Sequence, residues 1–297
     1  MIKVCDLHKN FDDFLALCGV NVNVPDGAIY GLVGPNGSGK TTLIKHLTGV
    51  FIADQGYIEI DGLDVRDNAA LRERIVYIPD DLYFFPQANI NDMINFYRRI
   101  YPNFDMERLD RLREVFALDH KKSIRRFSRG MKKHVAFMLG LCIKPDVYIL
   151  DEPMDGLDPV ARRKVWNLLF QEVVERNSTI FISSHNLREL EDACDHVGIM
   201  HQGQIVLERS LDELQSNIFK LQTAFRHEAP NFSHLNVLSQ NKAGSVLQLI
   251  IRGEKDEILN QVQALNPLMI DVLPLSLEEI FIHELGGMDY AVKDVIL

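Results

Sequence analysis

The stretch GPNGSGKTT, residues 34–42, constrains the fold more than any other part of the sequence. It has the spacing G-x-x-x-x-G-K-[ST] and stands between an apolar run, AIYGLV at 28–33, and a helical pattern. There the glycines let backbone N–H groups face inward, and the helix presents the positive end of its dipole to a polyphosphate. We therefore predict a nucleotide-binding strand–loop–helix unit, with Lys40 at the β- and γ-phosphates and Thr41 on Mg²⁺. The expected phosphate-binding residues are Gly34, Pro35, Asn36, Gly37, Ser38, Gly39, Lys40, Thr41 and Thr42.

Up to about residue 207, short apolar strands alternate with helical patterns, which indicates an α/β domain with a largely parallel sheet. Near-continuous apolar runs at 28–33, 146–151 and 179–184 are expected to be central strands that are covered on both faces. The segment 196–207 is expected to form an edge hairpin around a Gln-Gly turn.

Two further regions differ from this alternating pattern. Residues 81–142 read as an all-helical insertion, in which Ile90, Met93, Ile94 and Tyr97 share one helix face. After residue 214 the chain becomes polar, then strand-like at VLQLII and helix-like at LEEIFIHEL. We predict a first domain at 1–214, which contains the insertion, and a small C-terminal α+β domain at 215–297.

Composition narrows the classes of function. The formal net charge of −10 argues against a surface that follows a nucleic-acid backbone, so no nucleic-acid partner is expected. The four cysteines are scattered without a C-x-x-C pair, which favours free thiols in a reducing compartment. The N-terminus does not read as a signal peptide, and no apolar run approaches the roughly 18 to 20 residues needed to span a bilayer. We expect a soluble, cytoplasmic protein that needs a partner for any membrane role.

The strand VYILD is followed by two carboxylates and completes the nucleotide site. It is expected to deliver Asp151 to the magnesium ion, as the corresponding acidic residue does in P-loop ATPases. Glu152 comes next and is placed to act as the general base that polarises the attacking water. His185 follows the strand at 179–184, at the edge of the sheet where α/β proteins hold their ligands, and is expected to contact the γ-phosphate.

Taken in order, GPNGSGKTT, FSRGM, ILDEP, DGLDP and SSHNL resemble the motifs of the ATP-binding subunits of ABC transporters. The resemblance covers about the first 210 residues. It implies a P-loop NTPase sandwich with a helical subdomain, with ATP and Mg²⁺ as ligands and with Lys40, Glu152 and His185 as catalytic residues. It also implies that Asp158 lies in the D-loop of a dimer interface. Phe11 takes the position of the aromatic residue that stacks on adenine, with Phe14 as a nearby competitor.

Two positions depart from the family pattern. Asp80 stands where the family's Q-loop usually has a glutamine, and a carboxylate there is a candidate third magnesium ligand. The usual signature L-S-G-G-Q is replaced by FSRGM at 127–131, which keeps Ser128 and Gly130 and places Arg129 at the first glycine. In the family, the signature Ser and Gly close over the γ-phosphate bound by the other subunit. Ser128 is also a good N-cap for the helix that follows.

The signature lies in a strongly basic stretch. Arg129, Lys132 and Lys133 occupy the first turn of the expected helix, where cations oppose the helix dipole by roughly 0.3–1 kcal/mol each. We hypothesise that Arg129 contacts a phosphate or the D-loop in the closed dimer. For Lys121, Lys122, Arg125 and Arg126, a solvated surface, a protein partner and anionic lipid headgroups remain open as alternatives. These residues all lie within KKSIRRFSRGMKKHV, residues 121–135.

The function implied by the resemblance is ATP hydrolysis that powers a membrane transporter from its cytoplasmic face. The partners would be a separately encoded permease, docked in a groove around 84–101, and a second ATPase cassette, identical or different. The C-terminal PLSLEEIFIHEL resembles exporter-type subunits, which favours export. Two alternatives remain: a soluble ABC ATPase in translation or DNA maintenance, and a weakly hydrolysing regulatory ATP binder. The transported substrate belongs to the permease and cannot be read from this chain.

Overall fold

A computed structural model describes residues 2–216, 218–226, 230–273 and 275–284. The chain divides after Glu208 into two compact units, and each is described by itself. The sequence placed the boundary slightly later, after Leu214. The helix α8 (Leu211–Ser216) falls in the second unit, where it contacts β11 (Ile218–Ala224).

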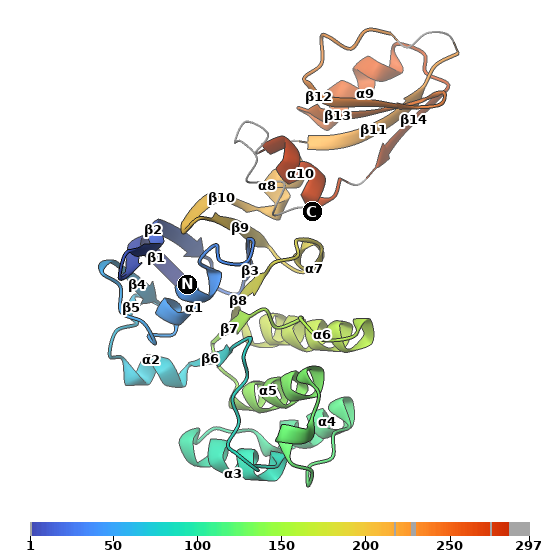
Figure 1. Ribbon diagram of the computed structural model, residues 1–297. Coiled ribbons are helices and arrows are strands. Elements are labelled where there is room, and N and C mark those ends of the chain that lie inside the picture. Colours follow the sequence, from blue (N-terminus) through green and yellow to red (C-terminus); the bar gives the residue numbers. More distant parts are fainter. Residues whose placement is uncertain (1, 217, 227–229, 274, 285–297) are drawn as a thin grey trace. The chain divides into compact units, whose positions relative to one another are not determined.

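A six-stranded sheet organises the first unit, with the order β10-β9-β3-β8-β7-β6. Neighbouring strands from β9 to β6 pair in parallel. All residues of β3, β7 and β8 are buried, as their apolar sequences predict. The predicted α/β class, the three central strands and the edge hairpin are confirmed (Figure 1). The strands are β3 (Ile29–Val33), β6 (Ile75–Ile78), β7 (Val147–Asp151), β8 (Thr179–Ser184), β9 (His196–His201) and β10 (Gln204–Ser210).

A second, antiparallel sheet was not predicted from the sequence. Its order is β2-β1-β4-β5, and it shares one hydrophobic core with the parallel sheet. The helix α1 (Lys40–Leu47) contacts β2 and β7, and its Leu43, Ile44 and Leu47 belong to this core. The phosphate-loop helix is therefore held between the two sheets. The strands are β1 (Ile2–Phe11), β2 (Phe14–Val24), β4 (Gln55–Ile60) and β5 (Leu63–Asp64).

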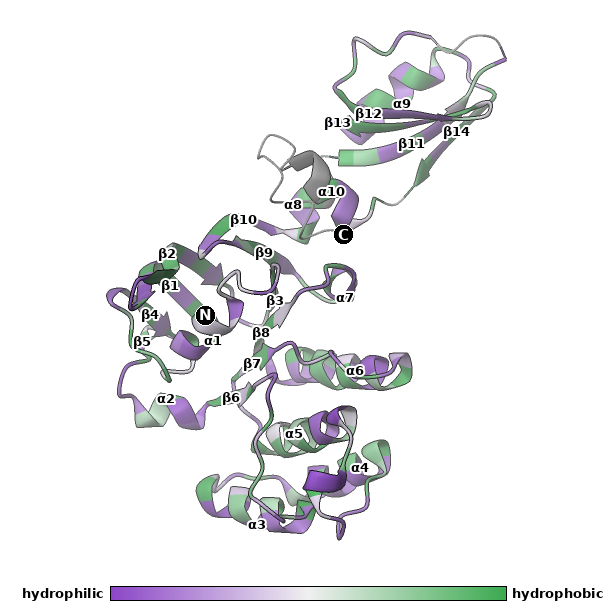
Figure 2. Ribbon diagram, viewed as in Figure 1, coloured by the Kyte–Doolittle hydropathy of each residue, from purple (hydrophilic) through white to green (hydrophobic). Residues whose placement is uncertain are grey.

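The expected helical insertion is present between β6 and β7. On α3 the predicted apolar face is confirmed, because Ile90, Met93 and Ile94 are buried while Tyr97 is half-buried. Asn89 and Asp92 form a capping box at the start of α3, which satisfies backbone N–H groups there. Figure 2 shows hydrophobic and hydrophilic residues interspersed along α5 and α6. The insertion contains α3 (Ile90–Ile100), α4 (Met106–Phe116), η1 (Ile124–Arg126) and α5 (Arg129–Ile143). The first unit also has α2 (Ala69–Glu73), α6 (Pro159–Arg176) and α7 (Arg188–Glu191) outside the insertion.

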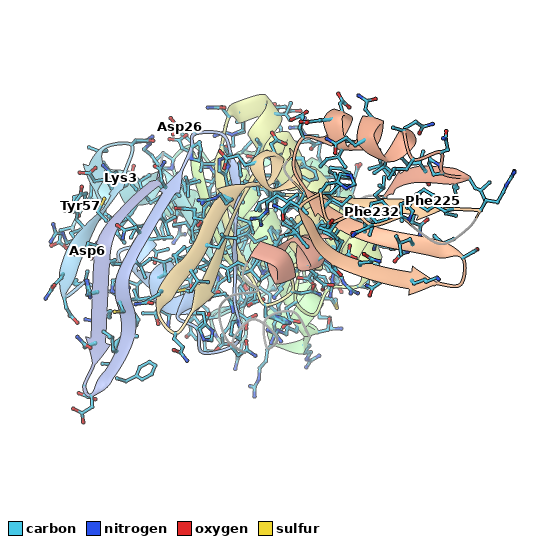
Figure 3. The ribbon with its side chains drawn as sticks, turned by 90° about the horizontal axis from the view of Figure 1, so that it is seen from above. Lys3, Asp6, Asp26, Tyr57, Phe225 and Phe232 are labelled. Atoms are coloured by element: carbon cyan, nitrogen blue, oxygen red, sulfur yellow. The ribbon has the colours of Figure 1, made fainter. Side chains whose placement is uncertain are left out.

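The second unit is a four-stranded antiparallel sheet, β12-β13-β11-β14, with helices α9 and α10. Its core includes Leu221, Leu249 and Val262, all fully buried. Phe225 and Phe232 lie next to each other in this unit, with ring centroids 6.1 Å apart (Figure 3). The remaining elements are β12 (Val237–Ala243), β13 (Val246–Arg252), α9 (Lys255–Gln263), β14 (Met269–Leu273) and α10 (Leu277–Glu284). The predicted helix at LEEIFIHEL is α10, except that Leu285 lies outside the described residues.

One buried carboxylate joins the helical insertion to the sheet. Glu172 of α6 is 1% exposed, accepts a 2.7 Å hydrogen bond from the Tyr148 hydroxyl of β7, and pairs with Arg108 of α4. Arg176 lies 3.4 Å from the same carboxylate. Burial raises the pKa of Tyr148 well above its usual range, so the phenol stays a donor. Glu172 thus connects α4, α6 and the strand that carries Asp151.

We expect Glu172→Gln to destabilise the first unit by about 3 kcal/mol, because two arginines lose their buried counter-charge. Urea denaturation followed by fluorescence of Trp166, the chain's single tryptophan, measures this loss. Glu175→Gln, on an exposed face of the same helix, is the matched control and should change stability by less than about 0.5 kcal/mol. Equal stabilities for the two variants would contradict the role given to Glu172.

Candidate functional site

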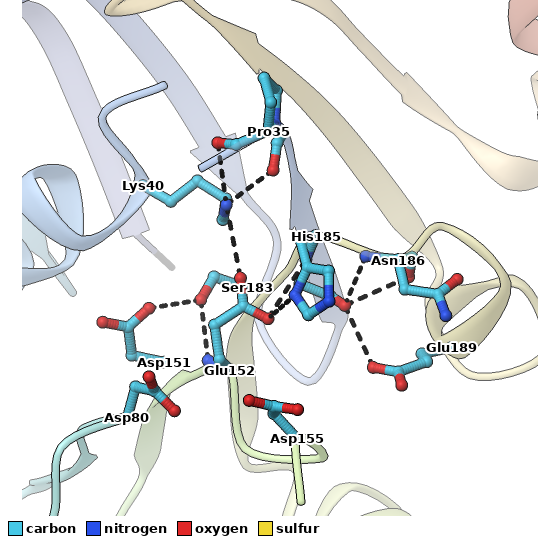
Figure 4. A network of polar contacts seen from close by, with 12 residues as sticks. Pro35, Lys40, Asp80, Asp151, Glu152, Asp155, Ser183, His185, Asn186 and Glu189 are labelled. Atoms are coloured by element: carbon cyan, nitrogen blue, oxygen red, sulfur yellow. Dashed lines mark hydrogen bonds and ion pairs between the residues drawn. The ribbon is translucent and has the colours of Figure 1, made fainter. Parts of the chain in front are cut away.

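The carboxyl edge of the parallel sheet brings the predicted site residues together. The strand β3 leads into the phosphate loop, and its neighbour β8 leads to His185. Next to β8, β7 ends at Asp151 and is followed by Glu152, and β6 then leads toward Asp80. Val33 pairs with Ser184 and Asp151 pairs with Ser183, so these strand ends are level. Figure 4 shows the resulting polar network.

The phosphate loop is shaped by close backbone approaches. A Cβ at Gly34 would lie 2.3 Å from the carbonyl oxygen of Met200, and Gly39 has a φ of 111° just before α1 begins at Lys40. Ser38 is 3% exposed, and its hydroxyl has no hydrogen-bond partner among the described residues. A buried donor of this kind, beside the N-terminus of α1, fits a phosphate oxygen.

Lys40 lies inside the loop and is 6% exposed. Its ammonium donates to the carbonyl oxygen of Gly34 at 2.6 Å and to that of Pro35 at 3.3 Å. The same nitrogen is 3.4 Å from Oε1 of Glu152. The loop cation and the carboxylate after β7 are therefore neighbours, as Figure 4 shows.

Asp151 is held in place by hydroxyl groups. It is 1% exposed, and its Oδ1 accepts a 2.6 Å hydrogen bond from Ser183 of β8. Burial raises the pKa of Asp151, whereas hydrogen bonds from Ser183 and Thr41 lower it. The Thr41 hydroxyl and the Asp151 carboxylate are hard oxygen donors of the kind that Mg²⁺ prefers. Within the described residues, no group of three or more acidic, histidine or cysteine side chains lies close enough together to hold a metal ion.

Glu152 occupies a constrained position between His185 and Lys40. Its φ of 46° lies in the left-handed region, which is uncommon for residues other than glycine and is concentrated at functional sites. The backbone N–H of Glu152 donates to Ser183 Oγ at 3.0 Å. Its Oε2 accepts the backbone N–H of His185 at 3.2 Å and lies 2.9 Å from His185 Nδ1. The carboxylate is thus fixed while His185 remains 48% exposed.

The two positions that depart from the family pattern contact each other. Arg129, at the start of α5, lies 2.5 Å from Oδ1 of Asp80 and 3.0 Å from Oδ2 of Asp155. Lys133, one turn along α5, is fully buried and lies 3.4 Å from Asp80. Lys133 also donates to the carbonyl oxygen of Glu152. Burial lowers the pKa of Lys133, and Asp80 opposes this shift.

Residues of the signature and the D-loop also cap helices. The Ser128 hydroxyl accepts the N–H of Met131 at 3.2 Å, so the predicted N-cap of α5 is confirmed. Asp158 caps α6, because its Oδ1 accepts the N–H groups of Val160 and Ala161, both at 2.9 Å. These backbone bonds lower the pKa of Asp158. A Cβ at Gly130 would lie 2.8 Å from the carbonyl oxygen of Gly156, so the first turn of α5 lies close to the backbone that precedes α6.

The candidate adenine-stacking residue lies at the tip of the β1–β2 hairpin. Phe11 is 39% exposed and makes an edge contact with Phe51 at 5.3 Å, while the Lys9 ammonium lies 5.5 Å from its ring centre. Phe14 pairs with Phe11 across the hairpin and is 64% exposed. Both side chains are thus partly exposed, and Phe11 is the one held by a neighbouring ring.

Three residues that shape the site were not assigned to it from the sequence, although Lys133 was noted in the basic stretch. The Ser183 hydroxyl donates to the Asp151 carboxylate and accepts the backbone N–H of Glu152. Lys133 and Asp155 complete the contacts of Asp80 and Arg129. The motif SSHNL contained a signal for Ser183, because alternate residues of a strand share a face and Ser183 lies two positions before His185. Lys133 and Asp155 carry no such signal, because their partners are distant in sequence.

Comparisons with known proteins agree with this arrangement. Residues 17–155 match the ABC transporter family. The chain is 32% identical over 288 residues to the ABC transporter ATP-binding protein YtrB of Bacillus subtilis, covering 97% of this chain and 99% of that protein. It is 32% identical to the bacitracin transport ATP-binding protein BcrA of Bacillus licheniformis, covering 97% and 98%. A solved structure of an ATP binding subunit of an ABC transporter superposes with a TM-score of 0.66 at 27% identity, covering 72% of this chain and 92% of that one.

We expect Ser183→Ala to destabilise the first unit by about 1–3 kcal/mol, because the buried Asp151 carboxylate loses a donor. The variant should also bind a nucleotide more weakly, since the Asp151 carboxylate and the Glu152 backbone lose their common hydrogen-bond partner. Chemical denaturation and calorimetric titration with ATP measure the two effects. Ser123→Ala is a suitable control, because the Ser123 hydroxyl makes no capping bond at η1. Wild-type values for Ser183→Ala in both measurements would refute this role.

Proposed function

The chain belongs to the ATP-binding subunits of ABC transporters, and we propose that it hydrolyses magnesium-bound ATP between two cassettes to drive export through a separate membrane permease. The observation that carries the proposal is the position of Glu152. Its carboxylate lies between the phosphate-loop Lys40 and His185, and its backbone conformation is held by Ser183. This arrangement suits a general base beside a γ-phosphate better than a solvated glutamate.

The proposed chemistry assigns separate roles to the three catalytic residues. Lys40 binds the β- and γ-phosphates and stabilises negative charge that moves toward the leaving ADP. Glu152 accepts a hydrogen bond from the attacking water and aligns it with the γ-phosphorus. His185 fixes the Glu152 carboxylate through the 2.9 Å contact at Nδ1, and its exposed ring can face the γ-phosphate. Phe11 stacks on the adenine ring, with Phe14 as the competitor.

We propose Thr41 and Asp151 as the protein ligands of Mg²⁺, since they are adjacent oxygen donors in the phosphate loop and at the end of β7. When bound there, the ion neutralises charge on the β- and γ-phosphates. Asp80 is the weaker candidate, because its carboxylate is already paired with Arg129 and Lys133.

Two cassettes would share each nucleotide in this proposal. Ser128 and Gly130 at the N-terminus of α5 present backbone N–H groups and a helix dipole, which suit a γ-phosphate held by a second subunit. Asp158 shapes the D-loop at the same interface by starting α6. The second cassette is a copy of this chain or a different ATPase.

The permease would dock on the helical insertion. No helix of the described residues is long and apolar enough to cross a membrane. A groove lies between the end of β6, the segment after it, and helices α3 and α5, and Tyr83, Phe84 and Tyr97 line it. Phe85 and Phe96 form an edge-to-face pair at 4.8 Å nearby. Docking there would place the subunit at the cytoplasmic face of the membrane.

Export rather than import is supported by the C-terminal segment and by the relatives. YtrB and BcrA align with nearly the whole chain, including the C-terminal unit, and BcrA is named for bacitracin transport. These relatives do not favour a role in translation or DNA maintenance. We propose that the C-terminal unit is an accessory domain that supports dimerisation.

Glu152→Gln should reduce the rate of ATP hydrolysis by at least about 100-fold, because the amide cannot act as a base, while ATP binding is retained. Phosphate release and calorimetric ATP titration measure the two properties. Glu175→Gln on the exposed face of α6 provides the charge-matched control. Hydrolysis at similar rates by both variants would remove Glu152 from the base role, and a wild type without hydrolysis would favour the regulatory alternative.

Tyr83→Asp should lower the amount of permease that co-purifies with the subunit by roughly tenfold, because a charge enters an apolar contact surface. The measurement is recovery of the multi-span membrane protein encoded beside this subunit. Tyr83 is 77% exposed, and Val174→Asp on α6, where Val174 is 83% exposed, adds the same charge away from the groove. ATP affinity is measured in parallel, because a variant that has lost its fold would also lose ATP binding, whereas a variant that has lost only docking would keep it. Equal recovery with both variants would place the permease elsewhere.

A further inference from the structure

Arg129 bridges two carboxylates that belong to different loops of the first unit. One guanidinium nitrogen lies 2.5 Å from Asp80, which follows β6, and another lies 3.0 Å from Asp155, which follows Glu152. An arginine suits this arrangement because its planar fork binds two acceptors at once. Arg129 therefore joins the signature, the Q-loop segment and the segment that leads into the D-loop within one protomer.

Lys133 adds a second cation to the same cluster. Its side chain is fully buried, and a buried ammonium is costly unless an opposite charge and hydrogen-bond acceptors surround it. Asp80 at 3.4 Å supplies that charge, and the carbonyl oxygen of Glu152 supplies an acceptor. The Asp80 carboxylate thus serves two cations of α5.

The charges in this cluster balance. Arg129 and Lys133 contribute two positive charges near the N-terminus of α5, where cations oppose the helix dipole, and Asp80 and Asp155 contribute two negative charges. The charges of Arg129 and Lys133 are therefore balanced by carboxylates of their own protomer. Figure 4 shows Asp80 beside Asp151, so an uncompensated Asp80 would add negative charge next to the proposed magnesium ligand.

We propose that Arg129 is a positioning residue that holds Asp80 as a counter-ion within its own protomer and keeps that carboxylate from repelling bound ATP. The two departures from the family pattern then form one functional unit, in which the charge at 129 compensates the charge at 80. The proposal rests on the proposed function, because it concerns the nucleotide site. In this proposal the Asp80 carboxylate pairs with the two cations of α5 and is not a ligand of Mg²⁺.

A double-mutant cycle in the Glu152→Gln background tests the proposal, with ATP affinity measured by calorimetry at saturating Mg²⁺. Arg129→Ala should weaken binding by roughly threefold to tenfold, because the Asp80 carboxylate loses one of its two cations near the phosphates. Asp80→Asn combined with Arg129→Ala should restore the affinity to within about twofold of the parent. Arg66→Ala, which breaks the exposed Asp64–Arg66 pair at 2.6 Å, is the control and should leave the affinity unchanged.

Three outcomes would overturn the proposal. If Asp80 ligates Mg²⁺, Asp80→Asn alone weakens binding and the double variant stays weak. If Arg129 contacts only the partner's phosphate, Asp80→Asn gives no rescue. If Arg129 is merely structural, its loss lowers the melting temperature without changing ATP affinity.

Thermal unfolding without nucleotide gives a readout that does not depend on the proposed function. Arg129→Ala should lower the melting temperature, and Asp80→Asn should lower it by less in the Arg129→Ala background than in the wild type, because one of the two cations that Asp80 pairs with is then already absent. Additive losses would show that the two residues are uncoupled. Failure of the Glu152→Gln parent to bind ATP would instead refute the proposed function, and the unfolding cycle would still decide the pairing.

Discussion

Parallel pairing of neighbouring strands is the constraint on which the site depends. Because β3, β8, β7 and β6 run in the same direction, their carboxyl ends meet at one edge, and the proposed catalytic residues follow these strand ends. Hydrogen bonding keeps these ends level, with Asp151 opposite Ser183. The helix α1 fills the space between this sheet and the antiparallel one, and it thereby fixes the phosphate loop against the same edge.

The buried carboxylates of the first unit described above are compensated by hydrogen bonds or ion pairs. Ser183 serves the buried Asp151, while Arg108, Arg176 and Tyr148 serve Glu172. Such contacts add modest net stability, but removing one partner leaves a desolvated group behind. The first unit therefore combines a conventional apolar core with a few polar connections that set the positions of loops and helices.

Local chemistry was predictable from the sequence, and long-range pairing was not. The phosphate loop, the central strands, the edge hairpin and the cap at Ser128 follow from spacing, apolar runs and residue type. The antiparallel sheet was missed because its strands mix polar and apolar residues. The contact between Asp80 and Arg129 spans 49 positions and depends on how β6 and α5 pack, which no local pattern encodes.

The close approach of Gly130 to Gly156 limits which positions of the signature can accept a side chain. A methyl group at position 130 would meet the carbonyl oxygen of Gly156 at 2.8 Å, so any side chain there would push two backbones apart. At position 129 the side chain instead reaches outward to carboxylates and remains 52% exposed. Of the two glycines in the usual motif, the first is therefore open to replacement and the second is sterically locked, which matches the sequence FSRGM.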